Sequence, residues 1–369
     1  MSAHGSEGVV RALEKLLEKA RQGKHGYLVG ILVGIGQKPH GFWGGSAPLE
    51  PIAALQLRDL SAMMDKLAVN KVLPARDPTV PANRVCYNMP LSPMSFDFVC
   101  WLIDAEMRRR IEGAPAPLRV AFWFGRDGKT GGLEDPYRKQ MFENVIRPML
   151  ALVGAVEDEE AVDGHCHPVF SPRPIVEMCA AGHEVPKFRA PADKLQAMAA
   201  RFPRKPVTIT LREAKKFPFR NSQMDEWLKF ARYLKARGET VIFVRDTAQA
   251  MVPVDGFQIC PEASLDLHWR LALYESAKMN LFVSNGPASL GHFSDIPWMM
   301  FLKKEDDDYA FTANTPTFWR EQIGVEMGVG QFPWSRPQDQ RIIWESDDYP
   351  NLVTAWEAFS GASHLAAVS

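Results

Sequence analysis

Apolar and polar residues alternate along most of this chain with two periods, one typical of strands and one typical of helices. Short apolar or β-branched runs predict strands, and apolar residues recurring every three to four positions predict helices. The predicted strands cover residues 27–35, 84–89, 118–124, 207–211, 240–245, 281–284 and 298–302. The predicted helices cover residues 9–21, 49–69, 96–111, 135–153, 192–201, 223–237, 264–279, 287–294 and 351–359. This alternation predicts an α/β fold with mainly parallel sheets.

The alternation lapses between residues 154 and 206, where Pro, His and acidic residues gather. A chain of 369 residues also exceeds the length at which a single core usually stops growing, so we expect two domains that share a cleft. The expected parts are an N-terminal helix (1–25), an N-terminal Rossmann-like domain (26–165), a linker (166–205), a C-terminal Rossmann-like domain (206–345), and a C-terminal helix and tail (346–369). The last helix is a candidate to cross back onto the first domain.

Composition narrows the classes of protein. The net charge of −1 argues against a surface built for nucleic acid. The five cysteines are odd in number and widely spaced, so we expect reduced thiols and a cytoplasmic location rather than a disulfide framework. The longest apolar run, Tyr27 to Ile35, is far shorter than the roughly 20 residues that a membrane span needs. The amphipathic helix at 9–21 can dock on the protein's own core or rest on a membrane, so we expect at most peripheral membrane contact.

The stretch from Leu281 to Gly291, LFVSNGPASLG, is the most informative motif. An apolar strand stops at Asn285-Gly286-Pro287, and small residues then begin a helix. Glycine permits a tight turn or a close backbone approach, and proline suits the first position of a helix. A helix that begins here would present unpaired N–H groups to a phosphate or diphosphate. An ordinary strand-to-helix turn with nothing bound is the alternative interpretation.

Polar and cationic residues follow two other predicted strands. Ligands in open α/β sheets bind beyond the carboxyl ends of the strands. The loop after strand 207–211 carries Arg212, Lys215, Lys216, Arg220 and Asn221, and the pair Arg245-Asp246 ends the next strand. These cations favour an anionic ligand. Ser222, after the loop, is expected to cap the following helix.

The order of these features resembles the C-terminal domain of GT-B glycosyltransferases. The succession is a strand ending in Arg212, a loop ending in Arg220-Asn221-Ser222, a helix, the strand Thr240–Val244, a helix, and the motif Leu281–Ser289. Within that fold, residues 205–302 are most similar to the heptosyltransferase-like and fucosyltransferase-like branches. The resemblance implies two Rossmann-like doubly wound domains facing a cleft.

The resemblance also implies a nucleotide-sugar donor held by the C-terminal domain, without a metal or a cofactor. The donor diphosphate would lie at the turn, with Arg212 or Arg220 neutralising its charge. The residues assigned to the donor are Arg212, Lys216, Arg220, Asn221, Arg245, Asn285, Gly286, Pro287, Ala288 and Ser289. The chain departs from the heptosyltransferase turn because no acidic residue lies between Ser284 and Ser294, which leaves the exact donor contacts open.

Sugar transfer with inversion needs a general base near the acceptor hydroxyl. Asp97 follows a strand and a loop in the order seen around the base of heptosyltransferases, and a residue that merely starts a helix is the alternative. His40 lies in the Gly-rich loop after the first strand, where a surface-loop histidine is the alternative. Asp127, Glu134 and Asp135 follow the third predicted strand and are further candidates.

Two other groups of residues have competing interpretations. His165, Cys166, His167, Cys179 and His183 match no paired zinc spacing, so an interdomain loop is favoured over a metal site. The late residues Trp319, Trp334, Arg336, Arg341 and Trp344 could stack on a sugar or base, but packing of the last helix on the sheet explains them more simply.

Taken together, the sequence predicts a glycosyltransferase that moves a sugar from a nucleotide-sugar donor to a glycan, lipid-linked or protein acceptor. A sugar-nucleotide 2-epimerase of the same fold and a catalytically silent GT-B-like binding or scaffold protein are the alternatives. No nucleic-acid partner is expected, and the oligomeric state is left open.

Overall fold

The computed structural model describes Pro81, residues 83–89, Ser92, and residues 94–124, 133–159, 172–215, 218–304 and 314–368. The chain divides into two compact units: Met1–Phe142 with Ala155–Pro172, and Glu143–Gly154 with Arg173–Ser369. The helices predicted at 9–21 and 49–69, the strand predicted at 27–35, His40 and Lys216 lie outside the described residues.

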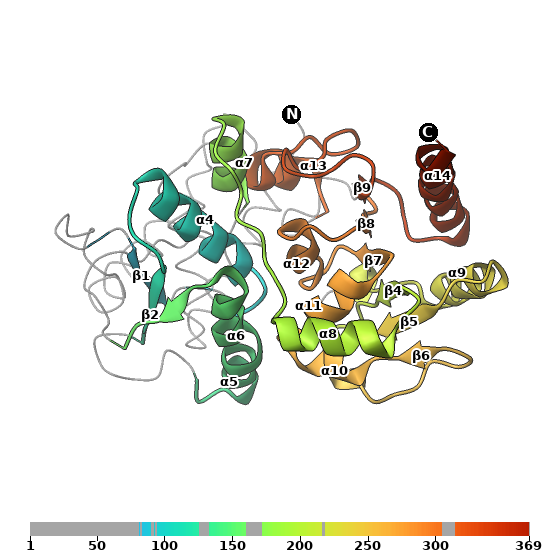
Figure 1. The fold of residues 1–369 in the computed structure, drawn as a ribbon, viewed down its shortest axis with the longest axis horizontal. Coiled ribbons are helices and arrows are strands. Elements are labelled where there is room, and N and C mark those ends of the chain that lie inside the picture. Colours follow the sequence, from blue (N-terminus) through green and yellow to red (C-terminus); the bar gives the residue numbers. More distant parts are fainter. Residues whose placement is uncertain are drawn as a thin grey trace, which may run out of the picture. The chain divides into compact units, whose positions relative to one another are not determined.

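The first unit contains a parallel sheet in the order β1-β2-β3 (Figure 1). Its described elements are β1 (Arg84–Asn88), α4 (Phe98–Ile111), β2 (Arg119–Trp123), α5 (Pro136–Met141) and β3 (Val156–Glu157). Helix α4 is buried from Phe98 to Met107. The Tyr87 ring of β1 meets Phe98 and Trp101 edge-on, with centroid distances of 4.8 and 5.0 Å. These aromatic contacts fix α4 on the sheet.

The second unit contains a parallel sheet in the order β6-β5-β4-β7-β8-β9. Its strands are β4 (Val207–Thr210), β5 (Val241–Val244), β6 (Gln258–Ile259), β7 (Met279–Val283), β8 (Trp298–Phe301) and β9 (Gln340–Ile343). Its helices are α6 (Arg147–Met149), α7 (Arg173–Ala180), α8 (Ala192–Arg201), α9 (Met224–Ala236), α10 (Pro261–Leu265), α11 (Leu267–Ser276), α12 (Ala288–His292), α13 (Pro316–Phe318) and α14 (Tyr349–Val368). Counted along the chain, the strands of this sheet have the spatial order 3-2-1-4-5-6, the doubly wound arrangement of nucleotide-binding domains.

Helices cover both faces of this second sheet. On one face, Ile209, Phe243 and Leu281 share a core with Trp227 of α9 and Trp356 of α14. On the other face, the Thr210 hydroxyl lies 2.8 Å from the Tyr274 hydroxyl of α11. Neighbouring residues of β4 therefore point to opposite helix layers, as expected for a strand buried on both faces. The predicted α/β architecture is confirmed, whereas two domains facing a cleft remain a prediction.

Most predicted elements occur within a few residues of their expected bounds, and the differences have physical causes. The helix predicted at 135–153 is broken into α5, a π-helical turn (Phe142–Ile146), α6 and a 3-10 turn (Leu150–Val153), because Pro148 cannot donate to the helical ladder. The helix predicted at 264–279 is α10 and α11, separated by Asp266. The backbone of Asp266 is extended, and its carboxylate accepts the Trp269 amide at 3.0 Å.

Among the described residues, five strands and α-helices were not predicted. One of them is α13, which has only three residues. Strands β3 and β6 have two residues each, too few for a period to show. Strand β9 begins at Gln340, a buried polar residue that interrupts the apolar run. Helix α7 falls within the Pro-rich and His-rich stretch that was assigned to the linker.

Helix α14 belongs to the core of the second unit. Its Leu352 and Trp356 side chains are buried there beside α9. Just before the helix, Asp347 accepts hydrogen bonds from the Gln223 amide at 2.9 Å and from Trp227 Nε1 at 2.6 Å. The crossing of this helix back onto the first domain stays a prediction.

Candidate functional site

The candidate site lies where the strand order of the second sheet reverses. Strands β4 and β7 are parallel neighbours, with Thr210 opposite Phe282. The chain leaves β4 toward β5 on one side and leaves β7 toward β8 on the other. Ligands of doubly wound sheets bind in the crevice beyond the carboxyl ends of such strands. The loops that follow Thr210 and Val283 are therefore the candidate ligand-binding segments.

The loop after β4 is closed on itself by hydrogen bonds. The Arg212 amide donates to Ser222 Oγ at 2.9 Å, and the Ser222 amide donates to the Arg212 carbonyl at 3.0 Å. Asn221 accepts the Ala214 amide and donates to the Ala214 carbonyl, each at 3.0 Å. The expectation that Ser222 caps α9 was wrong. Gln223 occupies the N-cap position without a side-chain bond, and Ser222 instead holds the base of the loop.

Two arginines of this loop, beyond the carboxyl end of β4, make different contacts. The Arg212 guanidinium donates to Asn221 Oδ1. Burial lowers the Arg212 pKa, and the charge of Asp246 opposes that shift, but an arginine stays protonated under all ordinary conditions. Arg220 reaches across to the end of β7, where its NH2 group donates to the Ser284 carbonyl at 3.2 Å and to the Ser284 hydroxyl at 3.3 Å. The structure thus joins the two predicted parts of the site through Arg220.

The turn after β7 satisfies much of its own hydrogen bonding. Asn285 Oδ1 accepts the Ala288 amide at 3.0 Å, and the Gly286 carbonyl accepts the Ser289 amide at 3.1 Å and the Ser289 hydroxyl at 2.6 Å. Pro287 is the N-cap residue, so the helix begins at Ala288, one position after the expected start. The expectation of unpaired amides at the helix start is therefore wrong for Ala288 and Ser289.

One feature of this turn still favours a ligand. The Nδ2 group of Asn285 is buried and has no hydrogen-bond acceptor among the described residues. Gly286 is accounted for by the turn itself, in which its carbonyl accepts the Ser289 amide.

Arg245, also assigned to the donor, is bound within the protein. It forms an ion pair with Glu213 through both carboxylate oxygens, and its NH1 group donates to the Val252 carbonyl at 2.9 Å. Asp246 Oδ2 accepts the Glu213 amide at 2.6 Å. Burial raises the Asp246 pKa, while that hydrogen bond and the charges of Arg270 and Arg212 oppose the shift. Sequence reasoning missed Glu213, although its place directly after Arg212 marked it as part of the same loop.

The candidate base Asp97 stands at the start of α4 in the first unit. It is exposed and accepts a hydrogen bond from Ser95 Oγ at 2.7 Å, but its side chain makes no capping bond to the helix. Among the alternatives, Asp135 accepts the Tyr137 amide at 2.9 Å and caps α5, so its carboxylate has a structural role. His40 and Asp127 lie outside the described residues.

The late aromatic residues pack on one another, but beside α12 rather than between the last helix and the sheet, where the packing interpretation placed them. Trp344 Nε1 donates to the Gly330 carbonyl at 3.0 Å, and its ring meets Trp319 edge-on at 4.8 Å. The Trp334 ring stacks on Phe293 at 5.1 Å and on Phe332 at 5.0 Å. These rings therefore form part of the core beside α12.

In the part of the chain that the structure describes, no group of three or more His, Cys, Asp or Glu side chains is arranged to hold a metal ion. His165, Cys166 and His167 lie outside that part of the chain. Within the same residues, no helix has both the length and the apolar character needed to cross a membrane.

Comparisons with known proteins gave matches among solved structures alone. Neither a protein-family model nor a curated protein matches the chain. The iron-containing dodecameric glycosyltransferase TibC from enterotoxigenic E. coli has 13% identity and a TM-score of 0.39, over 79% of this chain and 77% of that one.

Two further solved structures are similar to the chain. A family 9 glycosyl transferase from Veillonella parvula has 9% identity and a TM-score of 0.36, over 63% of this chain and 84% of that one. The ADP-heptose LPS heptosyltransferase II of E. coli has 10% identity and a TM-score of 0.34, over 76% of each chain. The identities and TM-scores of all three are low, so these likenesses give this chain no function.

Proposed function

We propose that this protein is a GT-B-type glycosyltransferase that takes its nucleotide-sugar donor at the crevice between β4 and β7. One observation carries the proposal: the strand order reverses between these strands, and Arg220 from the β4 loop bonds to Ser284 at the end of β7. A cation fixed at the switch point of a doubly wound sheet is suited to a diphosphate.

The donor's diphosphate would lie between the loop 212–221 and the turn 285–289. Arg220 and Arg212 would balance its charge, and Lys216 belongs to the same loop. The Asn285 Nδ2 group, buried without an acceptor among the described residues, would donate to a phosphate oxygen. Such donors also stabilise the charge that develops on the leaving nucleotide. In this proposal no metal ion and no cofactor are needed for that step.

Asp246 would bind the ribose of the donor. Nucleotide-binding domains with this strand order use an acidic residue after the first βα unit to accept ribose hydroxyls. Asp246 directly follows β5, the second strand of the sheet, and the Glu213 amide holds one of its carboxylate oxygens. In this assignment Arg245 positions the acidic residues through Glu213 rather than binding the donor itself.

The acceptor would bind in the first unit, where Asp97 or His40 would take the proton from the attacking hydroxyl. Asp97 is exposed at the end of the β1 loop and is not used to cap α4. The acceptor would be a glycan, a lipid-linked glycan or a protein, as the resemblance suggests.

Calorimetry with ADP, GDP, UDP and CDP tests the donor site. Arg220→Gln and Arg212→Gln should weaken binding of the preferred nucleotide about 10- to 100-fold, the worth of a lost charge-assisted hydrogen bond. Arg232→Gln, at an exposed position of α9, is the matched control and should change affinity less than twofold. Unaltered affinity in both site variants would exclude this crevice.

Product analysis then separates the chemistries. A glycosyltransferase consumes the nucleotide sugar only with an acceptor, whereas a 2-epimerase converts the sugar without one. Nucleotide binding without any turnover in the presence of cell-derived glycans, lipid-linked glycans and proteins would identify a silent binding protein.

A further inference from the structure

The turn at the candidate site continues into a helix that is too short to place itself. Helix α12 has five residues, whereas isolated helices shorter than about 12 residues are marginal in water. Its position must therefore come from contacts with the rest of the second unit, and the position of the turn 284–289 follows from it.

Every carbonyl oxygen from Leu290 to Ile296 accepts a hydrogen bond. The first three belong to the end of α12, where carbonyl groups have no partner within the helix. Ser294 supplies the donors for the first two: its hydroxyl to Leu290 at 2.7 Å and its amide to Gly291 at 3.2 Å. The Phe293 carbonyl accepts the Phe188 amide at 2.7 Å, from the segment between α7 and α8.

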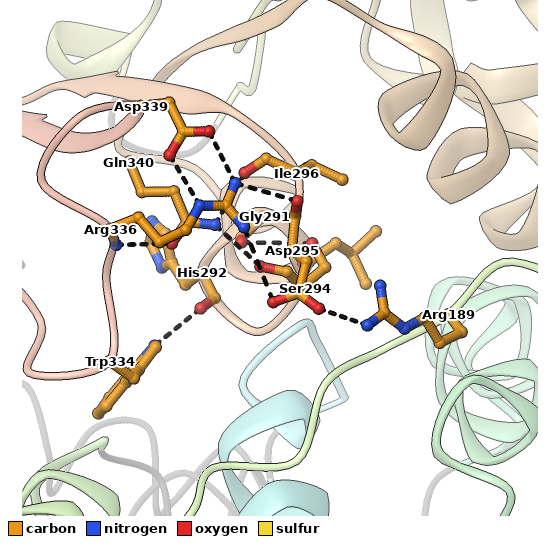
Figure 2. A network of polar contacts seen from close by, with 11 residues as sticks. Arg189, Gly291, His292, Ser294, Asp295, Ile296, Trp334, Arg336, Asp339 and Gln340 are labelled. Atoms are coloured by element: carbon orange, nitrogen blue, oxygen red, sulfur yellow. Dashed lines mark hydrogen bonds and ion pairs between the residues drawn. The ribbon is translucent and has the colours of Figure 1, made fainter.

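The other four carbonyls are held by side chains of residues 331–340, as Figure 2 shows. Trp334 Nε1 donates to His292 at 2.8 Å, and the Arg336 NH2 group donates to the Asp295 carbonyl at 3.1 Å. Gln340 Nε2 donates to Ser294 at 3.0 Å and to Ile296 at 2.8 Å.

These three side chains are themselves fixed. Gln340 is buried, and its Oε1 accepts the Arg336 amide at 3.0 Å. The Arg336 guanidinium forms a fork with Asp339, with both N···O distances at 2.8 Å. The Trp334 ring is stacked between Phe293 and Phe332. Donors held this firmly can impose a position on the backbone that they bind.

We propose that residues 331–340 are a positioning element for the turn 284–289. Trp334, Arg336 and Gln340 hold the backbone of residues 292–296, and this backbone in turn fixes α12 and the turn that precedes it. The element touches neither loop of the crevice in the contacts described above; it acts through the carbonyl groups that follow α12. Its effect on ligand binding rests on the proposed function, whereas its effect on the mobility of the turn does not.

Trp334→Phe is the most selective variant, because it keeps a stacked ring and removes the N–H that binds the His292 carbonyl. Trp344→Phe is the matched control: its Nε1 also donates to a backbone carbonyl, that of Gly330 at 3.0 Å, but that carbonyl lies outside the α12 segment. Both tryptophans are half-buried. Arg336→Lys is a second site variant, which keeps the charge and loses the fork.

Amide hydrogen exchange and nucleotide calorimetry measure the two consequences separately. We expect Trp334→Phe and Arg336→Lys to speed exchange about five- to tenfold in the peptide 284–293, the effect of losing one hydrogen bond. Affinity for the preferred of ADP, GDP, UDP and CDP should fall about three- to tenfold. Trp344→Phe should change the exchange rate of the peptide 284–293 and the nucleotide affinity less than twofold.

Equal exchange of this peptide in Trp334→Phe and Trp344→Phe would overturn the positioning role. Faster exchange with undiminished nucleotide affinity would overturn its link to binding. The site variants could exchange faster while the wild type binds none of the four nucleotides. That result would support the positioning role and refute the proposed function.

Discussion

Arg245 and Glu213 form an ion pair across two neighbouring strands, at the carboxyl ends of β5 and β4. Both carboxylate oxygens of Glu213 accept from the guanidinium of Arg245, and their side chains are 9% and 18% exposed. The pair therefore links the loops that follow β4 and β5, and the Arg245 guanidinium already has an acidic partner within the protein.

Removing Arg245 should lower stability more than it lowers nucleotide affinity. Arg245→Ala leaves a largely buried Glu213 without its partner and frees the Val252 carbonyl, so we expect a loss of about 2–4 kcal/mol in the free energy of unfolding. Urea unfolding measures this loss. Nucleotide affinity, compared with that of Arg220→Gln, should fall less; a larger fall in Arg245→Ala would return Arg245 to the donor contacts.

Gly291 lets α12 lie close to the sheet. A Cβ atom there would stand 3.3 Å from Cε2 of Phe282 and 3.6 Å from Cδ1 of Trp298, two buried rings that cannot move away easily. We expect Gly291→Ala to destabilise the protein by about 1–3 kcal/mol through overpacking, despite the better helix propensity of alanine. Thermal unfolding of Gly291→Ala and of the wild type measures this difference in stability.

Gly361 in α14 is the matched control for that substitution. It is also a helix glycine, but a Cβ there meets nothing within 4 Å. Gly361→Ala should therefore leave stability unchanged or raise it by up to about 1 kcal/mol. Equal effects at the two positions would show that α12 does not need a close approach to the sheet.

His292 should make stability depend on pH. Its ring centroid lies 4.9 Å from those of both Trp298 and Phe332, and burial lowers its pKa from 6.5 to about 3. The unfolded chain binds a proton near pH 6.5, whereas the folded chain resists it until about pH 3. The stability that the neutral ring contributes is therefore fully present above pH 6.5 and declines as the pH falls toward 3, by up to about 1.4 kcal/mol per unit.

The variant His292→Phe isolates the contribution of His292 to the pH dependence of stability. The other groups that titrate between pH 6.5 and 3 are the same in the variant and in the wild type. The variant keeps an aromatic ring and removes the buried Nε2 atom, which has no partner among the described residues. Urea unfolding between pH 7 and 4 should show a shallower loss of stability in the variant. Parallel pH profiles would mean that His292 is protonated in the folded protein near its ordinary pKa.

The sequence predicted the strands around the candidate site well, because β4, β5, β7 and β8 are buried runs bounded by turn residues. The pattern of residues did not give the strand order, which only the resemblance implied, and it missed β6 and β9, the two edge strands of the sheet. Pairing partners of this kind are set by tertiary packing, which leaves no period in the sequence.

At the candidate site too, the sequence predicted the residues but not the contacts between them. The sequence singled out Arg220 and Ser284 from their places after strands, but not the bond between them. It also predicted open amides at the start of α12, because a single sequence does not show that Asn285 Oδ1 turns back onto the Ala288 amide. Side-chain to backbone bonds of this kind compete locally and are decided by the fold.

The contribution of α14 to the second core has a practical consequence for dissecting this protein. A gene fragment that stops at residue 345 would omit Asp347, the acceptor for Trp227 Nε1, together with Leu352 and Trp356. The indole of Trp227 would then be left with a buried, unsatisfied donor, and an apolar sheet face would be open to water and to other chains. Expression of the second unit by itself therefore has to extend through Phe359, which packs against this core.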